Sequence, residues 1–163
     1  MALTFVVGTA ADVFAADLAR LIDAALGLTP GGEPYRSEPV NALGWRALQT
    51  RVLRTLDLAP QLTGIDAYQA VYVPSRDSGV EHIPVGNLAD PLQVGSLDAL
   101  LAELRAFAAA ASLPTDEVEL MGLAAQQLEN EDPDADLDEQ TYVQLILTAK
   151  QAHARRQPLW VVV

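Results

Sequence analysis

Cysteine is absent from this chain of 163 residues, and its absence excludes disulfides and thiolate chemistry. Lysine is scarce as well, since Lys150 is the one lysine among 10 basic residues, a usage typical of a GC-rich, bacterial genome. No apolar run approaches the ~18 residues that span a bilayer, and the segment from Met1 to Gly8 lacks the basic flank of a signal peptide. These absences predict a cytoplasmic protein.

Basic charge is both scarce and unevenly distributed. Arg105 and Lys150 are consecutive basic residues, and positions 106–149 between them carry 10 of the 22 carboxylates. The rest of the chain has 12 acidic against 10 basic residues, so it contributes only −2 to the net charge of −12. Because phosphate contacts supply most non-specific affinity, this balance opposes binding to nucleic acid and to anionic membranes. It favours basic proteins or metal cations as partners.

Apolar residues make up 50% of the sequence, enough to bury a sizeable core. We therefore expect one globular domain that covers residues 1–163. The apolar periodicities indicate the order β-α-α-β-β-α-α-α-β. They predict an α/β (or α+β) fold, in which a small mixed four-stranded sheet is packed by about five helices.

Four runs rich in β-branched and aromatic residues predict the strands. The first covers residues 4–7, and the last covers 159–163, a run that is apolar on both faces and would have to dock into the sheet. Between them, 68–73 and 80–85 are joined by the loop 74–79, whose Pro, Asp, Ser and Gly residues suit antiparallel strands. We expect this pair to form a hairpin.

The remaining segments show helical periodicity, and most have residues typical of a helix start or end. The first helix is expected between Asp12 and Gly27, and the second covers 40–57. Ser96 and Pro114 mark the start and the end of the third helix, and Thr115 is the expected N-cap of the fourth. The last helix should turn inward a stripe that contains Tyr142, Leu145, Ile146, Ala149 and His153.

The helix expected over 40–57 has two chemically different sides. Its apolar side is formed by Leu48, Val52 and Leu56. At 100° per residue, its opposite side carries three arginines, Arg46, Arg51 and Arg54. We expect these arginines to face solvent. The alternative is that they meet the acidic helices of another copy, so the sequence leaves a homo-oligomer open.

The segment 129–139 has carboxylates at alternate positions, as calcium loops do. A twelve-residue loop that starts at Asp132 would place Leu137 where such loops need glycine, and Val143 where they need a bidentate Glu. We expect instead a solvated connector whose Asp residues cap the following helix. A metal-binding regulator is an alternative, with the candidate ligands Asp132, Asp134, Asp136 and Asp138.

The pattern favours a non-enzymatic, soluble binding protein whose acidic surface, 116–139, engages a basic protein partner in the manner of an inhibitor or a chaperone. Like charges confined to one surface repel one another, but their field steers a basic partner toward it. No motif predicts a cofactor. The candidate partner-binding residues are Asp116, Glu117, Glu119, Glu129, Glu131, Asp132, Asp134, Asp136, Asp138 and Glu139.

The alternative function is a small hydrolase-like enzyme centred on His82 and the loop 74–79. The polar residues close to His82 in the sequence are Ser75, Asp77, Ser78 and Glu81. Because successive side chains of a strand alternate between faces, Glu81 could not orient the imidazole directly. Neither serine lies in a G-x-S-x-G motif, so we expect His82 to be a partly exposed strand residue.

Two other positions are expected to be structural. His153 lies near the end of the last helix, where a packing or capping role is favoured, and two histidines without cysteine do not make a structural zinc site. The turn at Gly8 has the strand-to-helix geometry that can bind phosphate. Asp12 would place a negative charge there, so we expect a simple glycine turn.

Overall fold

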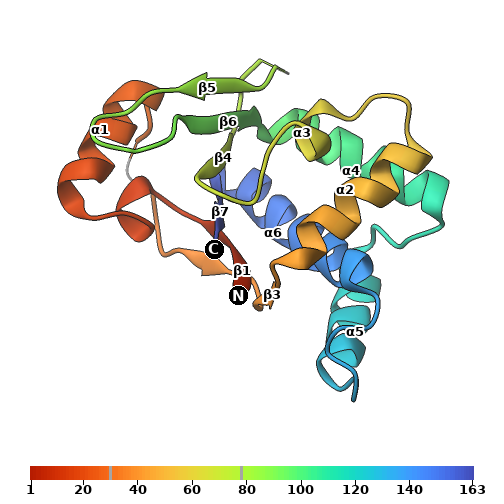
Figure 1. The fold of residues 1–163 in the computed structure, drawn as a ribbon. Helices are drawn as coiled ribbons and strands as arrows, with labels where there is room; N and C mark the ends of the chain where they lie inside the picture. Colours follow the sequence, from red (N-terminus) through yellow and green to blue (C-terminus); the bar gives the residue numbers. More distant parts are fainter. Residues whose placement is uncertain (30, 78) are drawn as a thin grey trace.

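The computed structural model describes residues 1–29, 31–77 and 79–163, which form a mixed α/β fold (Figure 1). The strands are β1 (Ala2–Val7), β2 (Tyr35–Arg36), β3 (Val40–Asn41), β4 (Ala70–Val73), β5 (Glu81–Ile83), β6 (Leu92–Ser96) and β7 (Leu159–Val162). The helices are the 3-10 helix η1 (Ala10–Asp12) and the α-helices α1 (Ala16–Leu26), α2 (Leu43–Thr55), α3 (Pro60–Thr63), α4 (Leu97–Ala111), α5 (Glu117–Leu128) and α6 (Leu137–Arg155). The predicted fold class is confirmed.

The strands form one mixed sheet in the order β2-β1-β7-β4-β6-β5, and β3 joins β2 along the outer edge of β1. β7 lies in the middle, antiparallel to both β1 and β4. Trp160 of β7 stands opposite Val6 of β1 and Val71 of β4, and all three are buried. The prediction that the last apolar run docks into the sheet is therefore confirmed.

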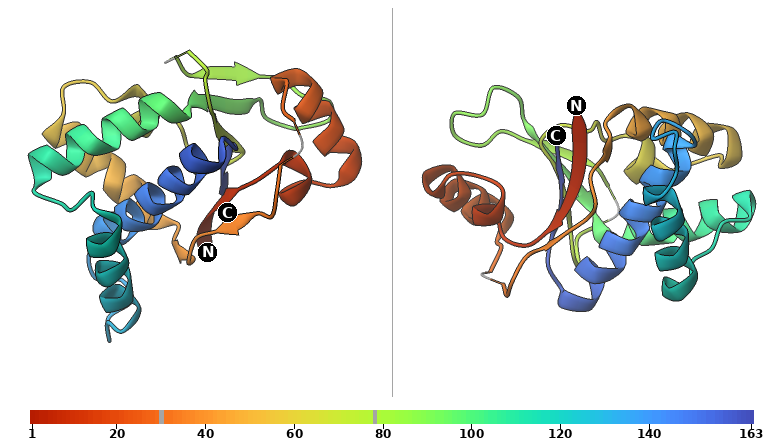
Figure 2. Two further views of the ribbon diagram at one scale, coloured as in Figure 1. Left: turned by 180° about the vertical axis from the view of Figure 1, so that it is seen from behind. Right: turned by 90° about the horizontal axis from the view of Figure 1, so that it is seen from below.

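Helices cover both faces of the sheet (Figure 2). On one face, η1 and α1 pack against Val6, Val71 and Trp160 through residues such as Ile22. On the other face, α2, α3, α4 and α6 form the larger core, which includes Phe5 of β1. α5 lies outside this layer, against α6, and projects from the body of the molecule (Figures 1 and 2).

The predicted hairpin is wrong. β4 and β5 do not pair with each other, because β6 lies between them, parallel to β4 and antiparallel to β5. The prediction of a four-stranded sheet omitted β6 and the two-residue strands β2 and β3. β6 directly precedes the helix cap at Ser96, so its five buried residues merge in the sequence with the apolar start of α4. The loop 74–79 suits an antiparallel turn, but it does not specify which strand becomes the partner.

Several helix ends agree with the sequence signals, and others do not. Gly27 ends α1 in the left-handed conformation with a φ of 64°, and the Ser96 Oγ accepts a hydrogen bond from the Ala99 N–H at 3.2 Å. The expected helix over 40–57 starts only at Leu43, because residues 40 and 41 pair with β1. The N-cap of α5 is Asp116 and not Thr115.

α6 is the central helix of the larger core. Every residue from Thr141 to Ala149 is buried, which includes the predicted Tyr142, Leu145, Ile146 and Ala149. His153 does not belong to this buried stripe, since its side chain is exposed and its Nδ1 lies 3.5 Å from an Asp98 carboxylate oxygen. Among the helices of the described residues, none has the length and apolar character required to cross a bilayer.

Candidate functional site

The acidic residues predicted to bind a partner lie in two groups. Asp116, Glu117 and Glu119 are at the start of α5, and the other seven follow its end, in the connector 129–136 and the first turn of α6. About 15 Å of helix separates the groups, because Glu119 and Glu129 are ten positions apart and each residue adds about 1.5 Å. Eight of the ten are exposed, whereas Asp138 and Glu139 are half-buried. The structure therefore places them around one projecting helix and not on a single continuous patch.

α5 is held against α6 along one side only. Leu120 is fully buried in the larger core, and Leu123 and Ala124 pack on it. Two side chains of α6 fix the segment that leads into α5, since the Tyr142 Oη donates to the Pro114 carbonyl oxygen at 2.6 Å and the Lys150 Nζ donates to the Thr115 carbonyl oxygen. The position of α5 is thus set by α6.

The other side of α5 exposes a second apolar stripe. Val118, Met121 and Leu128 are 78%, 59% and 65% exposed, and Ala125 between them is exposed as well. We call these four residues the α5 stripe. Their positions, i, i+3, i+7 and i+10, are the spacing by which one helix packs against another. A helix that has already buried one side therefore presents a second packing surface to solvent.

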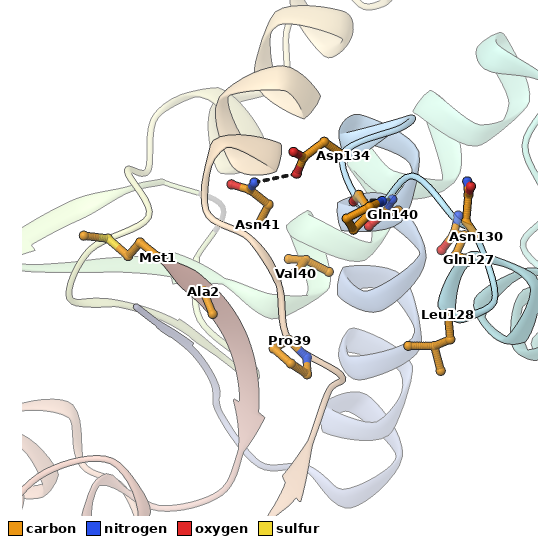
Figure 3. Close-up of a pocket in the computed structure, with 11 residues that line it drawn as sticks. Met1, Ala2, Pro39, Val40, Asn41, Gln127, Leu128, Asn130, Asp134 and Gln140 are labelled. Carbon is orange, nitrogen blue, oxygen red and sulfur yellow. Dashed lines mark hydrogen bonds between the residues drawn. The ribbon is translucent and has the colours of Figure 1, made fainter.

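An open pocket of about 400 Å³ lies where the stripe ends (Figure 3). Leu128 of the α5 stripe forms part of its wall, together with Val40 of β3 and Gln140 of α6. Asn41 and Asp134 also contribute to the wall, and the Asn41 Nδ2 donates to the Asp134 Oδ1 at 3.0 Å. The pocket wall thus combines apolar side chains with amides and a carboxylate. Such a wall suits a side chain that has an apolar stem and a basic end group.

The connector 129–136 is held by hydrogen bonds within itself and from α6. The Asp132 Oδ1 accepts from the Asp134 N–H at 3.1 Å, and the Gln140 Nε2 donates to the Ala135 carbonyl oxygen at 2.6 Å. Asp136 occupies the N-cap position of α6, but its side chain makes no capping bond. A cap side chain reaches the helix from an extended backbone, whereas Asp136 is left-handed with a φ of 52°. The prediction that the connector's Asp residues cap α6 is therefore wrong.

The cations near this surface are few. An Arg51 guanidinium nitrogen lies 2.9 Å from the Asp138 Oδ2, and this guanidinium also sits 5.6 Å from the centre of the Phe107 ring. Arg51 therefore joins α2 to α6 and does not point freely into solvent as expected. Within the described ranges, Asp138 is the only one of the ten acidic residues in an ion pair. The other nine have no cation within ion-pair distance among the described residues.

The metal-site alternative gains no support. In the part of the chain that the structure describes, no group of three or more His, Asp or Glu side chains could hold a metal ion together. Three of the four candidate ligands are used by the protein itself: Asp138 by Arg51, Asp134 by Asn41, and Asp132 by a backbone N–H.

The features of the enzyme alternative also stay apart. His82 is exposed on the edge strand β5, and Glu81 forms an ion pair with Arg76 at 3.0 Å. Ser75 and Asp77 are exposed, and Ser78 lies outside the described residues. At the Gly8 turn, the Asp12 Oδ2 accepts from the Thr9 N–H at 2.8 Å, so a carboxylate already occupies the place of a phosphate, as the sequence predicts.

Tyr142→Phe should loosen the attachment of α5, because the Pro114 carbonyl loses its donor. We expect a loss of about 1 kcal/mol in the free energy of unfolding at neutral pH. Burial raises the pKa of Tyr142 from 10.0 to about 12, so the phenol ionises more readily in the unfolded chain. Its contribution to stability is complete below pH 10 and is lost as the pH rises from 10 to about 12.

Urea unfolding at neutral pH and at about pH 11 measures both effects. Tyr68→Phe is the matched control, since the Tyr68 side chain is exposed. If the Tyr142→Phe variant lost stability at alkaline pH as steeply as the wild type, the assigned role of this hydroxyl would be wrong.

The surface therefore has three parts: the α5 stripe, the uncompensated carboxylates at both ends of α5, and the pocket beside Leu128. The sequence prediction identified the carboxylates from their charge but missed the stripe. The signal was present, because four apolar residues of α5 recur at heptad-like spacing. Comparison with protein-family models, with curated proteins and with solved structures finds no match to this chain.

Proposed function

We propose that this protein is a non-enzymatic binding protein that uses α5 and the connector to engage a basic protein partner. The observation that carries the proposal is the α5 stripe, which is exposed between two groups of carboxylates, of which only Asp138 forms an ion pair in the described residues. Scattered single apolar residues are normal on a protein surface, whereas an aligned apolar stripe is typical of an interaction surface.

The stripe and the charges have different roles. Burying a large apolar side chain contributes about 1.5 to 3 kcal/mol, so Val118, Met121 and Leu128 supply the affinity. The carboxylates accelerate encounter with a positive segment and disfavour acidic competitors. The partner chemistry that fits both is an amphipathic helix with apolar residues on one side and Arg or Lys beside them. Covering such a segment on another protein is the physical basis of inhibitor-like or chaperone-like action.

A designed helical peptide tests the proposal directly. Its sequence places leucines at heptad spacing with flanking arginines, and a second peptide carries glutamates in place of the arginines. We expect the basic peptide to bind the wild-type protein, with an affinity that falls as salt rises, and the acidic peptide to bind far more weakly. Isothermal titration calorimetry at low and high salt measures both affinities.

Two sets of variants separate the roles of stripe and charge. Met121→Gln with Leu128→Gln should weaken peptide binding about tenfold at all salt concentrations. Neutralising four carboxylates whose side chains make no hydrogen bond or ion pair among the described residues should weaken it mainly at low salt. These four are Glu117→Gln, Glu129→Gln, Glu131→Gln and Asp136→Asn.

The matched controls lie on the opposite side of the sheet or at its edges. Leu21→Gln replaces an exposed leucine of α1, and Asp90→Asn removes an exposed carboxylate away from α5. Both should bind the basic peptide as the wild type does. The proposal fails if the wild-type protein binds neither peptide, or if the stripe variants bind with unchanged affinity.

A further inference from the structure

Exposed large apolar residues cluster on two helices of this protein. Six of the ten such side chains in the described residues belong either to α5 or to α2 and the segment directly after it. The α5 members form the stripe described above. The others are Leu43, Leu53 and Leu58, each at least two-thirds exposed.

α2 has a solvent-facing side that, like the α5 stripe, forms a narrow strip along the helix. At 100° per residue, five exposed residues fall within an arc of about 100°. We call them the α2 face: Leu43, Arg46, Thr50, Leu53 and Arg54. The opposite side of α2 packs into the core through Trp45, Leu48 and Val52, whereas the α2 face is exposed.

The α2 face and the α5 stripe match in length. Leu43 and Leu53 are ten positions apart, as are Val118 and Leu128, and each pair therefore spans about 15 Å of helix. The two leucines of the α2 face can therefore contact the α5 stripe near both of its ends when the helices lie side by side.

The two surfaces are opposite in charge. Arg46 and Arg54 belong to the α2 face, and neither makes an ion pair within the described residues. Glu117 and Glu129 flank the α5 stripe and are also without a cation there. Pairing of α5 with a second α5 would place carboxylates against carboxylates, and pairing of α2 with α2 would oppose arginines. Electrostatics thus favours one combination, α2 with α5.

We infer that a second copy of this chain is an occupant of the α5 stripe, and that it docks through its α2 face. Both surfaces are exposed in each copy, so each is available to the other surface on a second copy. If the two copies are related by a twofold axis, each contact occurs twice, because α2 of one copy meets α5 of its partner and the reverse. The inference rests on the α5 stripe being an interaction surface, as in the proposed function. The part of it that concerns the α2 face does not depend on the proposed function.

Sedimentation velocity at low ionic strength measures the association. In about 10 mM salt the Debye length is about 30 Å, so the charge complementarity acts at full strength. We expect the wild-type protein to sediment as a species larger than a monomer and to return toward the monomer at high salt. Arg46→Glu with Arg54→Glu should be monomeric in both conditions, and so should Glu117→Arg with Glu129→Arg.

Mixing the two charge-reversed variants gives the decisive result. In each variant alone, the α2 face and the α5 stripe carry charges of the same sign. In the mixture, the acidic α2 face of the first variant meets the basic α5 stripe of the second. The unchanged α2 face of the second variant and the unchanged α5 stripe of the first still have opposite charges. The mixture should therefore regain the larger species. Arg20→Glu with Arg156→Glu is the matched control, because both arginines are exposed and lie outside α2, and this variant should associate as the wild type does.

Three results would overturn the inference: a monomeric wild-type protein at low salt, association that persists in the α2 variant, or a mixture that stays monomeric. The proposed function fails separately. The α2 variant keeps the α5 stripe, so it should still bind the basic peptide. A monomeric wild type that binds this peptide contradicts only the self-association, and a self-associating protein whose α2 variant ignores the peptide contradicts only the proposed function.

Discussion

Gly44→Ala should lower the free energy of unfolding by about 2 to 3 kcal/mol. A Cβ at this position in α2 would lie 2.1 Å from the Thr141 Oγ1 and 2.9 Å from the Leu137 carbonyl oxygen, both in α6. The Thr141 Oγ1 already donates to that carbonyl at 2.8 Å, so neither atom is free to move away. The added methyl group must therefore push α2 away from α6, the central helix of the larger core.

Gly122→Ala is the matched control for this prediction. It makes the same substitution in a helix, but a Cβ at Gly122 meets no atom within 4 Å. Alanine is the better helix former, so this variant should gain about 0.5 to 1 kcal/mol. Urea unfolding of both variants measures whether the free energy of unfolding falls for Gly44→Ala and rises for Gly122→Ala. Equal effects at the two positions would show that α2 and α6 are not in close contact at Gly44.

Glu103→Ala should cost about 2 to 4 kcal/mol, because it removes the partner of two backbone donors at once. The Glu103 carboxylate accepts from the Gln61 N–H at 3.0 Å and from the Leu62 N–H at 2.9 Å, at the start of α3. Ala59, the N-cap of α3, has no side-chain acceptor of its own. Each buried N–H left without a partner costs about 1 to 3 kcal/mol.

The effect of Glu103 should also depend on pH. Burial raises the pKa of the Glu103 carboxyl above the ordinary 4.5. The hydrogen bonds from the two N–H groups lower this pKa, but their effect is smaller. The folded state therefore holds the proton more tightly than the unfolded chain does. The stability gained from this difference is complete below pH 4.5 and is lost as the pH rises through the raised pKa. The difference in unfolding free energy between wild type and Glu103→Ala should thus shrink toward neutral pH.

Denaturant unfolding from about pH 4 to pH 7 tests both statements. Glu38→Ala serves as the control, since its side chain is exposed and makes no hydrogen bond among the described residues. Near-equal stability of Glu103→Ala and Glu38→Ala at every pH would rule out Glu103 as the cap of α3.

Local signals in the sequence predicted much of the secondary structure. Ser96 and Gly27 act within one turn of their own helices, and the apolar run of β7 needs burial wherever it lies. The pairing of strands could not be predicted in this way. Leu92–Ser96 is the common partner of β4 and β5, and no signal within either of those segments specifies it.

The candidate site shows the same division. Its charges were visible in composition, but Arg51 and Asp138 are 87 positions apart, and nothing near either residue predicts that they pair. Likewise, Glu103 caps α3 from 41 and 42 positions away. Two apolar sides of α5 were available for packing, and the fit of Leu120 against the core decides which one is buried. Only the tertiary structure shows that the α5 stripe is the side left to solvent.

The central position of β7 has a consequence for the order in which the protein can fold. β1 and β4 are synthesised well before β7, and each needs it for one of its edges. Until residues 159–162 emerge, β1 and β4 each have one open edge, the kind of edge that promotes aggregation. The sheet therefore closes only once β7 has been translated, and until then the inner edges of β1 and β4 are open to strands of other chains.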